Sequence, residues 1–237
     1  MKKILTFITR DSADTTDGDV PEEVEILGTE GKNLSEALKK AKGRYTVLAD
    51  GDLTCDITED IFKNLATDNS DVLVFRGSSL FKTSVLKNLT AKQCGGKFST
   101  EAYAAFQSKS IKRYNTQPFS FTPVKREYSE KEQSALAEIL TEFAKGKSKL
   151  TKEIYSFTFD LLCDKLVLFY SVALLAIYDK KLKPEKLKEF DLKLKENIVL
   201  YLALDKRFGA GNLGKIREQN FKISFITALK LRKNINV

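Results

Sequence analysis

Residues 45–53 read Tyr-Thr-Val-Leu-Ala-Asp-Gly-Asp-Leu, an apolar run that ends at two carboxylates, Asp50 and Asp52. Alternate side chains of an extended segment point to the same face, so both carboxylates can reach one cation. Hard divalent ions such as Mg²⁺ and Mn²⁺ take carboxylate oxygens and often share them with substrate phosphates. A solvated acidic turn is the more common explanation of a bare D-x-D pattern. The flanking sequence therefore has to decide between a metal site and such a turn.

The sequence around this motif alternates between strand and helix patterns. Short apolar strands are predicted at residues 3–8, 24–27, 45–49 and 71–75. One helix is predicted to begin at Asn33, a good N-cap residue with Glu36 at the third helical position, and to end at Gly43. A second is predicted to begin near Asp56. Strands separated by short helices predict parallel pairing and an α/β fold, and ligands bind such sheets outside the carboxyl ends of the strands, where Asp50 lies.

The composition excludes several kinds of catalysis. The 237 residues include no histidine, which removes Ser-His-Asp and Cys-His catalysis, His-ligated zinc and any imidazole base. Three widely spaced cysteines fit neither a disulfide framework nor a zinc site, so reduced thiols are expected. The longest apolar stretch, Leu166–Tyr178, has 13 residues against the ~20 that a membrane helix needs. The apolar start of the chain is too short for a signal peptide, and the sequence predicts a cytoplasmic protein.

The two halves of the chain differ in pattern and in charge. From about Ser129 the apolar residues follow helical periods, which predicts a domain at 1–128 and a helical region at 129–237. Residues 1–100 carry 14 Lys/Arg against 16 Asp/Glu, for a charge of −2, and residues 101–237 carry 26 against 16, for +10. This asymmetry indicates either an anionic partner for the second half or a solvated helical face.

The segment from Glu30 to Asp52 resembles the central signature of family 2 glycosyltransferases. In that signature a helix leads to A-x-G-x-Y, then to an apolar strand and D-x-D. The positions that fall in register are Ala41, Gly43, Tyr45, Asp50 and Asp52. Further segments are similar to the helix after the metal motif (53–65), the next strand (70–75), the segment after the acceptor-side strand (80–86), the acidic pair (98–103) and the closing segment of aromatics and arginine (118–126).

The resemblance covers roughly residues 1–128 and implies a GT-A fold, a mostly parallel sheet with flanking helices, here followed by a helical C-terminal region. It implies a metal-dependent, inverting transfer from a nucleotide-sugar, with a UDP-sugar the expected donor and a polysaccharide or glycolipid the expected acceptor. It places Mn²⁺ or Mg²⁺ on Asp50 and Asp52 and the catalytic base at Glu101. The nucleotide contacts that it implies are Thr9, Asp11, Lys32, Ser35 and Asp50.

The chain departs from the family pattern at several places. About twenty residues stand in for the two strand–helix units that normally precede Val24. The family's A-R-N is replaced by Asn33-Leu34-Ser35, and its acidic pair is reduced to Thr100-Glu101. Two alternatives therefore stay open: a catalytically degenerate GT-A-like binding protein, and a basic helical scaffold that binds nucleic acid, although nucleic acid is the less expected partner.

Two features of the second half need separate interpretation. Gly209–Gly214 spells G-x-G-x-x-G, but a helical pattern precedes it and only 23 residues follow, which favours a loop. Residues 206–237 carry eight basic residues against Glu218, and Phe221, Phe225 and Leu229 lie among them. This pattern indicates either a basic helix at an anionic membrane surface, where a lipid-linked acceptor is reached from the inner face, or packing onto the helical half.

Overall fold

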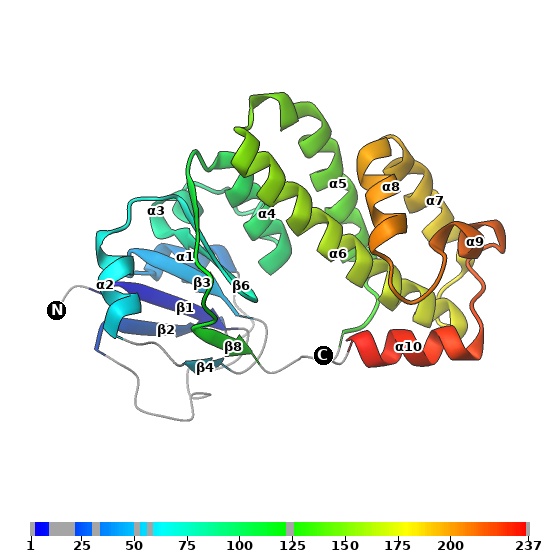
Figure 1. Cartoon of the computed structure of the whole chain (residues 1–237), viewed down its shortest axis with the longest axis horizontal. Coiled ribbons are helices and arrows are strands. Elements are labelled where there is room, and N and C mark those ends of the chain that lie inside the picture. Colours follow the sequence, from blue (N-terminus) through cyan, green and yellow to red (C-terminus); the bar gives the residue numbers. More distant parts are fainter. Residues whose placement is uncertain are drawn as a thin grey trace. The chain divides into compact units, whose positions relative to one another are not determined.

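The computed structural model of the chain describes residues 3–9, 22–29, 34–49, 53–55, 59–121 and 126–235 (Figure 1). The chain divides into two compact units. Unit 1 comprises Met1–Val124 and Leu150–Ile154, and unit 2 comprises Lys125–Lys149 and Tyr155–Val237. Each unit is described by itself below.

Unit 1 is built on a six-stranded sheet with the strand order β2-β1-β3-β6-β5-β7. Its strands are β1 (Leu5–Thr9), β2 (Val24–Gly28), β3 (Tyr45–Leu48), β5 (Val72–Phe75), β6 (Ser78–Lys82) and β7 (Ile111–Arg113). Within the described residues β6 runs antiparallel to β3 and β5, and the other neighbouring strands pair in parallel. The predicted mostly parallel α/β sheet is therefore confirmed.

The strand β6 was not predicted from the sequence. It follows β5 through Arg76 and Gly77, and Gly77 has a φ of 77°, which glycine adopts without strain. A two-residue connection joins antiparallel strands, whereas parallel neighbours need a long crossover. The pattern of alternating strands and helices therefore gave the parallel strands correctly and missed the hairpin between two of them.

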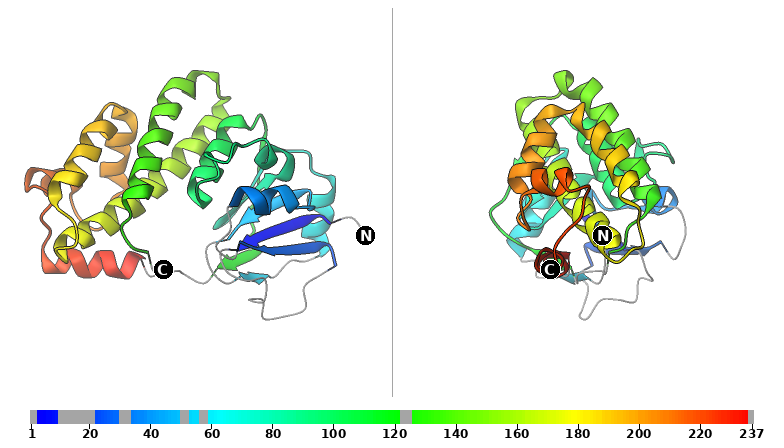
Figure 2. Two further views of the ribbon diagram at one scale, coloured as in Figure 1. Left: turned by 180° about the vertical axis from the view of Figure 1, so that it is seen from behind. Right: turned by 90° about the vertical axis from the view of Figure 1, so that its right-hand side faces the viewer.

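Different helices cover the two faces of the sheet (Figures 1 and 2). The helix α2 (Glu59–Thr67) packs on one face, where Leu65 is fully buried. The other face carries α1 (Leu34–Lys40) and α3 (Thr83–Lys87), and α3 contacts both α1 and α4 (Lys97–Gln107). The core on the α2 face consists of Leu5, Phe7, Val24, Tyr45, Val47, Leu65, Leu73, Phe75 and Leu80. Alternate residues of each strand enter this core, as expected for strands covered by a helix.

A short two-stranded ribbon corrects one expectation. The family resemblance implied a helix over residues 53–65, but β4 (Leu53–Cys55) pairs antiparallel with β8 (Phe119–Phe121), and the structure describes α2 over Glu59–Thr67. The extended partner supplies backbone hydrogen bonds to residues 53–55, which a local helical pattern does not reveal. The predicted starting residues of the helix, Asp56 and Ile57, lie outside the described residues.

Gly43, which was expected to end the helix α1, lies three residues beyond its last residue, Lys40, and has a different role. A Cβ at this position would lie 2.5 Å from the backbone nitrogen of Thr6, so only glycine allows the α1–β3 connection to approach β1. The Gly43 amide donates to Thr6 Oγ1 at 2.8 Å, and the Thr6 hydroxyl donates to Glu25 Oε2 at 2.8 Å. These two hydrogen bonds link the α1–β3 connection to both β1 and β2.

Tyr45, at the start of β3, fixes the other end of this connection. Its side chain is fully buried, and its hydroxyl lies 3.0 Å from the carbonyl oxygen of Asp68 and 2.9 Å from that of Ser70. Burial raises the pKa of Tyr45 to about 12, so the hydroxyl stays a donor at neutral pH. Gly43 and Tyr45 of the signature thus have structural roles in this chain: they hold β3 in place.

Unit 2 is helical, as predicted. Its elements are α5 (Glu130–Gly146), η1 (Lys147–Lys149), α6 (Lys152–Tyr178, of which the first residues belong to unit 1), α7 (Pro184–Lys195), α8 (Ile198–Arg207), α9 (Leu213–Glu218) and α10 (Phe225–Ile235). The Ser129 hydroxyl accepts a hydrogen bond from the Glu132 amide and caps α5. The segment Gly209–Gly214 follows the helix α8 and runs into α9, so it is the expected loop and has no preceding strand.

The helix α6 is longer than the 13-residue apolar stretch seen in the sequence. It has 27 residues and a mean hydropathy of 1.9 in its most apolar window, enough to cross a membrane by length and composition alone. In the structure it is the central helix of unit 2, and Leu162, Cys163, Leu166, Phe169, Tyr170, Ala173 and Leu174 are all buried. Arg207 of α8 pairs with Asp160 at 2.6 Å and Asp164 at 3.4 Å on its polar side. These ion pairs are typical of a core helix in a helical domain.

Candidate functional site

The candidate site lies at the carboxyl edge of β2, β1 and β3, because ligands of open α/β sheets bind there. The three strands end level with one another: Thr9 is opposite Gly28, and Ile8 is opposite Leu48. Backbone hydrogen bonds continue the register, since Ala49 N donates to the Ile8 carbonyl at 2.9 Å. The chain then continues from Ala49 into the D-x-D motif.

Two of the predicted nucleotide contacts are described by the structure. Thr9 is the last residue of β1 and is 3% exposed. Ser35 is buried in the first turn of α1, the helix that follows β2, so both residues belong to segments that meet at the carboxyl edge. Asp11, Lys32, Asp50 and Asp52 lie outside the described residues. The nucleotide and metal roles of all six residues stay predictions.

Described strands lie on both sides of the D-x-D motif in the sequence. The strand β3 precedes it through Ala49, and β4 begins at Leu53, directly after Asp52. In the antiparallel ribbon Leu53 is opposite Phe121, so part of the segment 118–126, which resembles the last family motif, pairs with the strand that follows the D-x-D motif. Figures 1 and 2 both show this ribbon beside the carboxyl ends of β1 and β2. Two segments of the resemblance that are far apart in sequence are thus brought together.

Glu101, the predicted base, lies in the middle of α4 and is 7% exposed. A carboxylate at this depth is stable only when hydrogen bonds or charges compensate for its lost hydration, so its burial favours a specific role over a solvated surface position. The neighbouring Thr100 donates its hydroxyl to the Gly96 carbonyl at 2.8 Å, a bond within the helix. Since Asp52 lies outside the described residues, the separation between Glu101 and the metal motif stays untested.

The expected metal ligands are judged by their donor chemistry. Two carboxylates are hard oxygen donors, and they suit Mg²⁺ or Mn²⁺ better than a soft metal. Among the residues that the structure describes, no group of three or more Cys, Asp or Glu side chains is arranged to hold a metal ion. The assignment of Asp50 and Asp52 therefore rests on their donor chemistry and on their place after β3.

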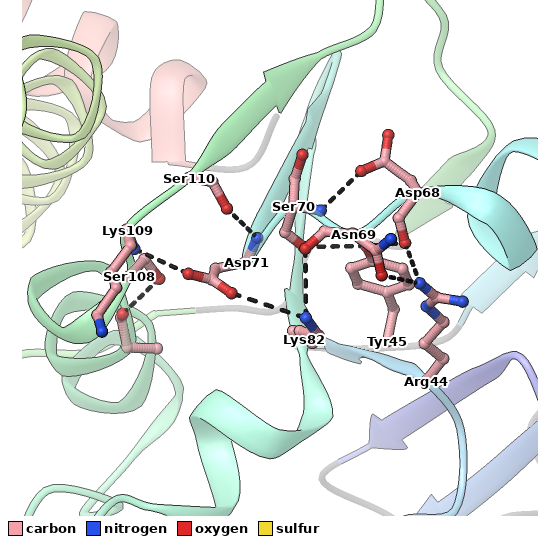
Figure 3. Close-up of polar contacts among 11 residues, drawn as sticks. Arg44, Tyr45, Asp68, Asn69, Ser70, Asp71, Lys82, Ser108, Lys109 and Ser110 are labelled. Atoms are coloured by element: carbon pink, nitrogen blue, oxygen red, sulfur yellow. Dashed lines mark hydrogen bonds and ion pairs between the residues drawn. The ribbon is translucent and has the colours of Figure 1, made fainter.

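A second polar cluster lies at the opposite, amino edge of β3 and β5 (Figure 3). Arg44 donates to the carbonyl oxygens of Ala66 and Asp68, both at 2.5 Å, and so satisfies groups at the end of α2. The Asp68 carboxylate accepts from Lys112 Nζ at 2.8 Å and from the Tyr114 hydroxyl at 2.9 Å. This cluster joins α2, β3 and β7 into one structure.

The hydrogen bonds and charges of this cluster shift the pKa values of Asp68 and Lys112. Burial alone would raise the pKa of Asp68, but hydrogen bonds from Lys112, Ser70 and Tyr114 outweigh burial and lower it well below the usual carboxyl range. The hydrogen bond to Asp68 also raises the pKa of Lys112 above its ordinary value. Perturbed groups often mark active sites, but here the partners belong to the sheet framework and lie at the edge away from the D-x-D motif. We interpret the cluster as structural.

Unit 2 contains a pocket of about 440 Å³. Its lining residues are Glu185, Lys188, Asp191, Leu192, Arg217, Glu218, Asn220 and Phe221. Arg217 is 8% exposed at its side chain, donates to Asp191 at 2.7 Å, also pairs with Asp205, and stacks 3.9 Å from the ring centre of Tyr201. The Tyr170 hydroxyl donates to the same Asp191 oxygen at 2.5 Å. The charge of Arg217 is thus used inside the unit, where it holds α7, α8 and α9 together.

The sequence did not identify these two clusters or the β4–β8 ribbon. Each joins residues that are far apart in the chain: Asp68 and Lys112, Arg217 and Asp191, Leu53 and Phe121. No local spacing or capping pattern marks such pairs in a single sequence.

No protein-family model matches the chain, and no curated protein matches it by sequence. Solved structures of S. aureus TarS resemble it. TarS 1–349 in complex with UDP is 12% identical, with a TM-score of 0.52 over 99% of this chain and 90% of that one. TarS 1–349 in complex with UDP-GlcNAc is 13% identical, with a TM-score of 0.50 over the same shares. A further TarS structure is 11% identical, with a TM-score of 0.54 over 99% of this chain and 55% of that one.

The likeness to TarS confirms the predicted GT-A-like fold class, a mixed sheet with flanking helices and a helical C-terminal region. At 11–13% identity it concerns the fold alone and does not single out family 2 among proteins of this fold. It extends over 99% of the chain, so it includes the helical unit, for which the sequence offered no family motif.

Proposed function

We propose that this protein is a glycosyltransferase that moves a sugar from a nucleotide-sugar, of the UDP-sugar class, to a saccharide or lipid-linked acceptor. One observation carries the proposal: a D-x-D motif follows β3 at the carboxyl edge of a GT-A-like sheet. The TarS structures of this fold were determined with UDP and with UDP-GlcNAc, which supports a uridine nucleotide as the ligand class. The proposal places the protein in the cytoplasm, at the inner face of the membrane when the acceptor is lipid-linked.

In this proposal Asp50 and Asp52 hold Mn²⁺ or Mg²⁺ against the diphosphate. A divalent ion at that place neutralises the negative charge that develops on the departing diphosphate. Thr9 ends β1 and Ser35 lies in the first turn of α1, and together with Asp11 and Lys32 they are assigned to nucleotide contacts. Backbone and hydroxyl groups at strand ends and first helical turns are suited to bind phosphate oxygens.

The proposed base is Glu101. Its carboxylate removes the proton from an acceptor hydroxyl as the oxygen attacks the anomeric carbon of the donor sugar. The new C–O bond forms on the face opposite the leaving group, the bond from the anomeric carbon to the diphosphate breaks, and the nucleoside diphosphate departs with the electron pair. A single displacement of this kind inverts the anomeric configuration, so the product linkage reports on the mechanism.

A thermal-shift screen tests the donor class. UDP, GDP and ADP are added to the protein with and without Mn²⁺, because a ligand that binds the folded state raises the apparent stability. We expect UDP with Mn²⁺ to give the largest rise, and equal or absent responses to all three nucleotides would contradict the proposal. Metal-dependent UDP binding without transfer to any acceptor would indicate the degenerate binding protein. Salt-dependent affinity for nucleic acid, with no response to UDP, would indicate the scaffold instead.

A further inference from the structure

The helix α10 exposes large apolar side chains on one face. Phe225 is 60% exposed, Ile226 66% and Leu229 48%. Residues four apart lie on the same side of a helix, so Leu229 continues the row of Phe225, and Ile226 lies on the adjacent row. Three neighbouring large apolar side chains in water form a patch that is unusual unless something covers it.

The outward orientation of this face is fixed by the packing on the other side. Ala228, Leu231 and Ile235 are buried, at spacings that place them on the opposite face of α10. Arg232 donates to Asp179, just after α6, at 2.8 Å and lies 5.8 Å from the ring centre of Tyr178. Figure 1 shows α10 (red) beside this end of α6. The helix is therefore anchored, and its apolar residues stay directed outward.

The same helix presents cations without any carboxylate. Lys230 and Lys233 of α10 are exposed, as is Lys222 in the segment before the helix, and no Asp or Glu occurs after Glu218 in the sequence. Lys230 follows Ile226 by four residues, and Lys233 follows Leu229 by four, so each of these cations extends an apolar row. The lysine stems are themselves apolar and let the ammonium groups reach a charged surface beside the patch.

In the structure, only part of the basic segment predicted at residues 206–237 is available to a partner. Phe221 is 2% exposed and belongs to the core of unit 2, so it is unavailable to a partner. Arg207 and Arg217 are paired with carboxylates inside the unit. Lys206 and Lys215 are exposed as well, but they lie on α8 and α9. We call the exposed set of α10, Phe225, Ile226, Leu229, Lys230 and Lys233, the α10 face.

We propose that the α10 face docks on an anionic phospholipid surface. Such a surface can bind both the apolar and the cationic side chains of this face. The apolar side chains enter the boundary between headgroups and acyl chains, while the lysines attract the negative lipid headgroups. A second copy of the chain fits less well, since a two-fold contact would bring the same lysines together with no carboxylate from this face to pair with them. Nucleic acid would meet the lysines but leave Ile226 and Leu229 against a charged backbone.

Unit 2 offers a matched control surface. Ile198, Val199 and Leu202 of α8 and Leu192 of α7 are exposed by 52% to 59%, close to the values on α10. The α7 surface around Leu192 carries exposed charges of both signs, since Glu185 and Glu189 lie on this helix among four lysines. Exposed apolar area is thus similar on the two surfaces, but the charge around α7 is mixed, whereas the α10 face carries lysines alone.

Vesicle co-sedimentation without nucleotide tests the proposal independently of the proposed function. The full chain is mixed with phosphatidylcholine vesicles with and without phosphatidylglycerol, at low and high salt. We expect binding to the anionic vesicles only, weakened by salt. Lys230→Gln with Lys233→Gln should reduce the partition roughly 25-fold, about fivefold for each cation removed. Phe225→Ser with Leu229→Ser should reduce it roughly tenfold or more.

The control Val199→Ser with Leu202→Ser should bind anionic vesicles as the parent does, and circular dichroism should show every variant folded. Equal binding by the parent and both α10 variants would overturn the proposal, as would equal binding of the parent to neutral and anionic vesicles. Sedimentation velocity identifies the competing occupant: a dimer of the parent that dissociates in the Phe225→Ser, Leu229→Ser variant would assign this face to a second copy and would also overturn it.

Discussion

Replacing Gly43 with alanine tests whether the close approach of the α1–β3 connection to β1 stabilises the position of β3, the strand that precedes the D-x-D motif in the sequence. The added Cβ would lie 2.5 Å from Thr6 N, 2.6 Å from the Leu5 carbonyl carbon and 2.6 Å from Thr6 Oγ1. Two of these atoms belong to the backbone and cannot rotate away. Overpacking of this kind costs about 1–3 kcal/mol.

To relieve this overlap the backbone at residue 43 has to move away from β1. That movement strains two hydrogen bonds, from Gly43 N to Thr6 Oγ1 at 2.8 Å and from Thr83 Oγ1 to the Gly43 carbonyl at 2.6 Å. Each contributes about 1 kcal/mol, so the free energy of unfolding should fall by roughly 3–5 kcal/mol in all. In a protein of this size the Tm should then fall by on the order of 10 °C. Circular dichroism recorded during thermal unfolding measures this change in Tm.

Gly209→Ala is the matched control for this prediction. No atom lies within 4 Å of a Cβ built at Gly209, so its Tm should stay close to that of the parent. If Gly43→Ala unfolds at the parent temperature, or if both variants lose the same stability, the role assigned to Gly43 is wrong.

Two further predictions concern Asp68 and Glu101. Because the folded pKa of Asp68 is lowered, its contribution is complete above the ordinary carboxyl pKa of about 3.9 and is lost as the pH falls through the folded value. Asp68→Asn should therefore cost on the order of 1–3 kcal/mol at pH 7, and the Tm difference from the parent should shrink below about pH 4, whereas a constant difference down to pH 2 would refute the charged pairing. Glu101→Gln should lower turnover by about 10²–10⁴ with UDP affinity retained, and unchanged turnover would rule out Glu101 as the base.

The strands of the α/β sheet could be predicted because each is a local apolar run bounded by polar turns. Residues 24–27, 45–49 and 71–75 were all placed within one residue of the observed strands. The helical second half was equally accessible, since its apolar periods are sustained over many turns. The helical period expected from about Ser129 does not locate the breaks between helices, such as the one between α7 and α8.

The elements that were missed depend on contacts between distant residues. The strand β4 pairs with Phe119–Phe121, and nothing in Leu53–Cys55 alone predicts a strand with a partner so distant in the sequence. The role of Gly43 likewise depends on how near β1 lies. For the site, the sequence indicated the D-x-D motif and the carboxyl edge, and the structure locates Thr9, Ser35 and Glu101 in the fold.

The central claim is that Asp50 and Asp52 hold a divalent metal against a nucleoside diphosphate, and calorimetric titration of UDP in the presence of Mn²⁺ tests it most directly. The parent should bind UDP much more tightly with Mn²⁺ than with a chelator. Asp50→Asn and Asp52→Asn should each remove this metal-dependent gain while the Tm without ligand stays that of the parent. Metal-dependent binding of UDP by both variants with the affinity of the parent would contradict the claim.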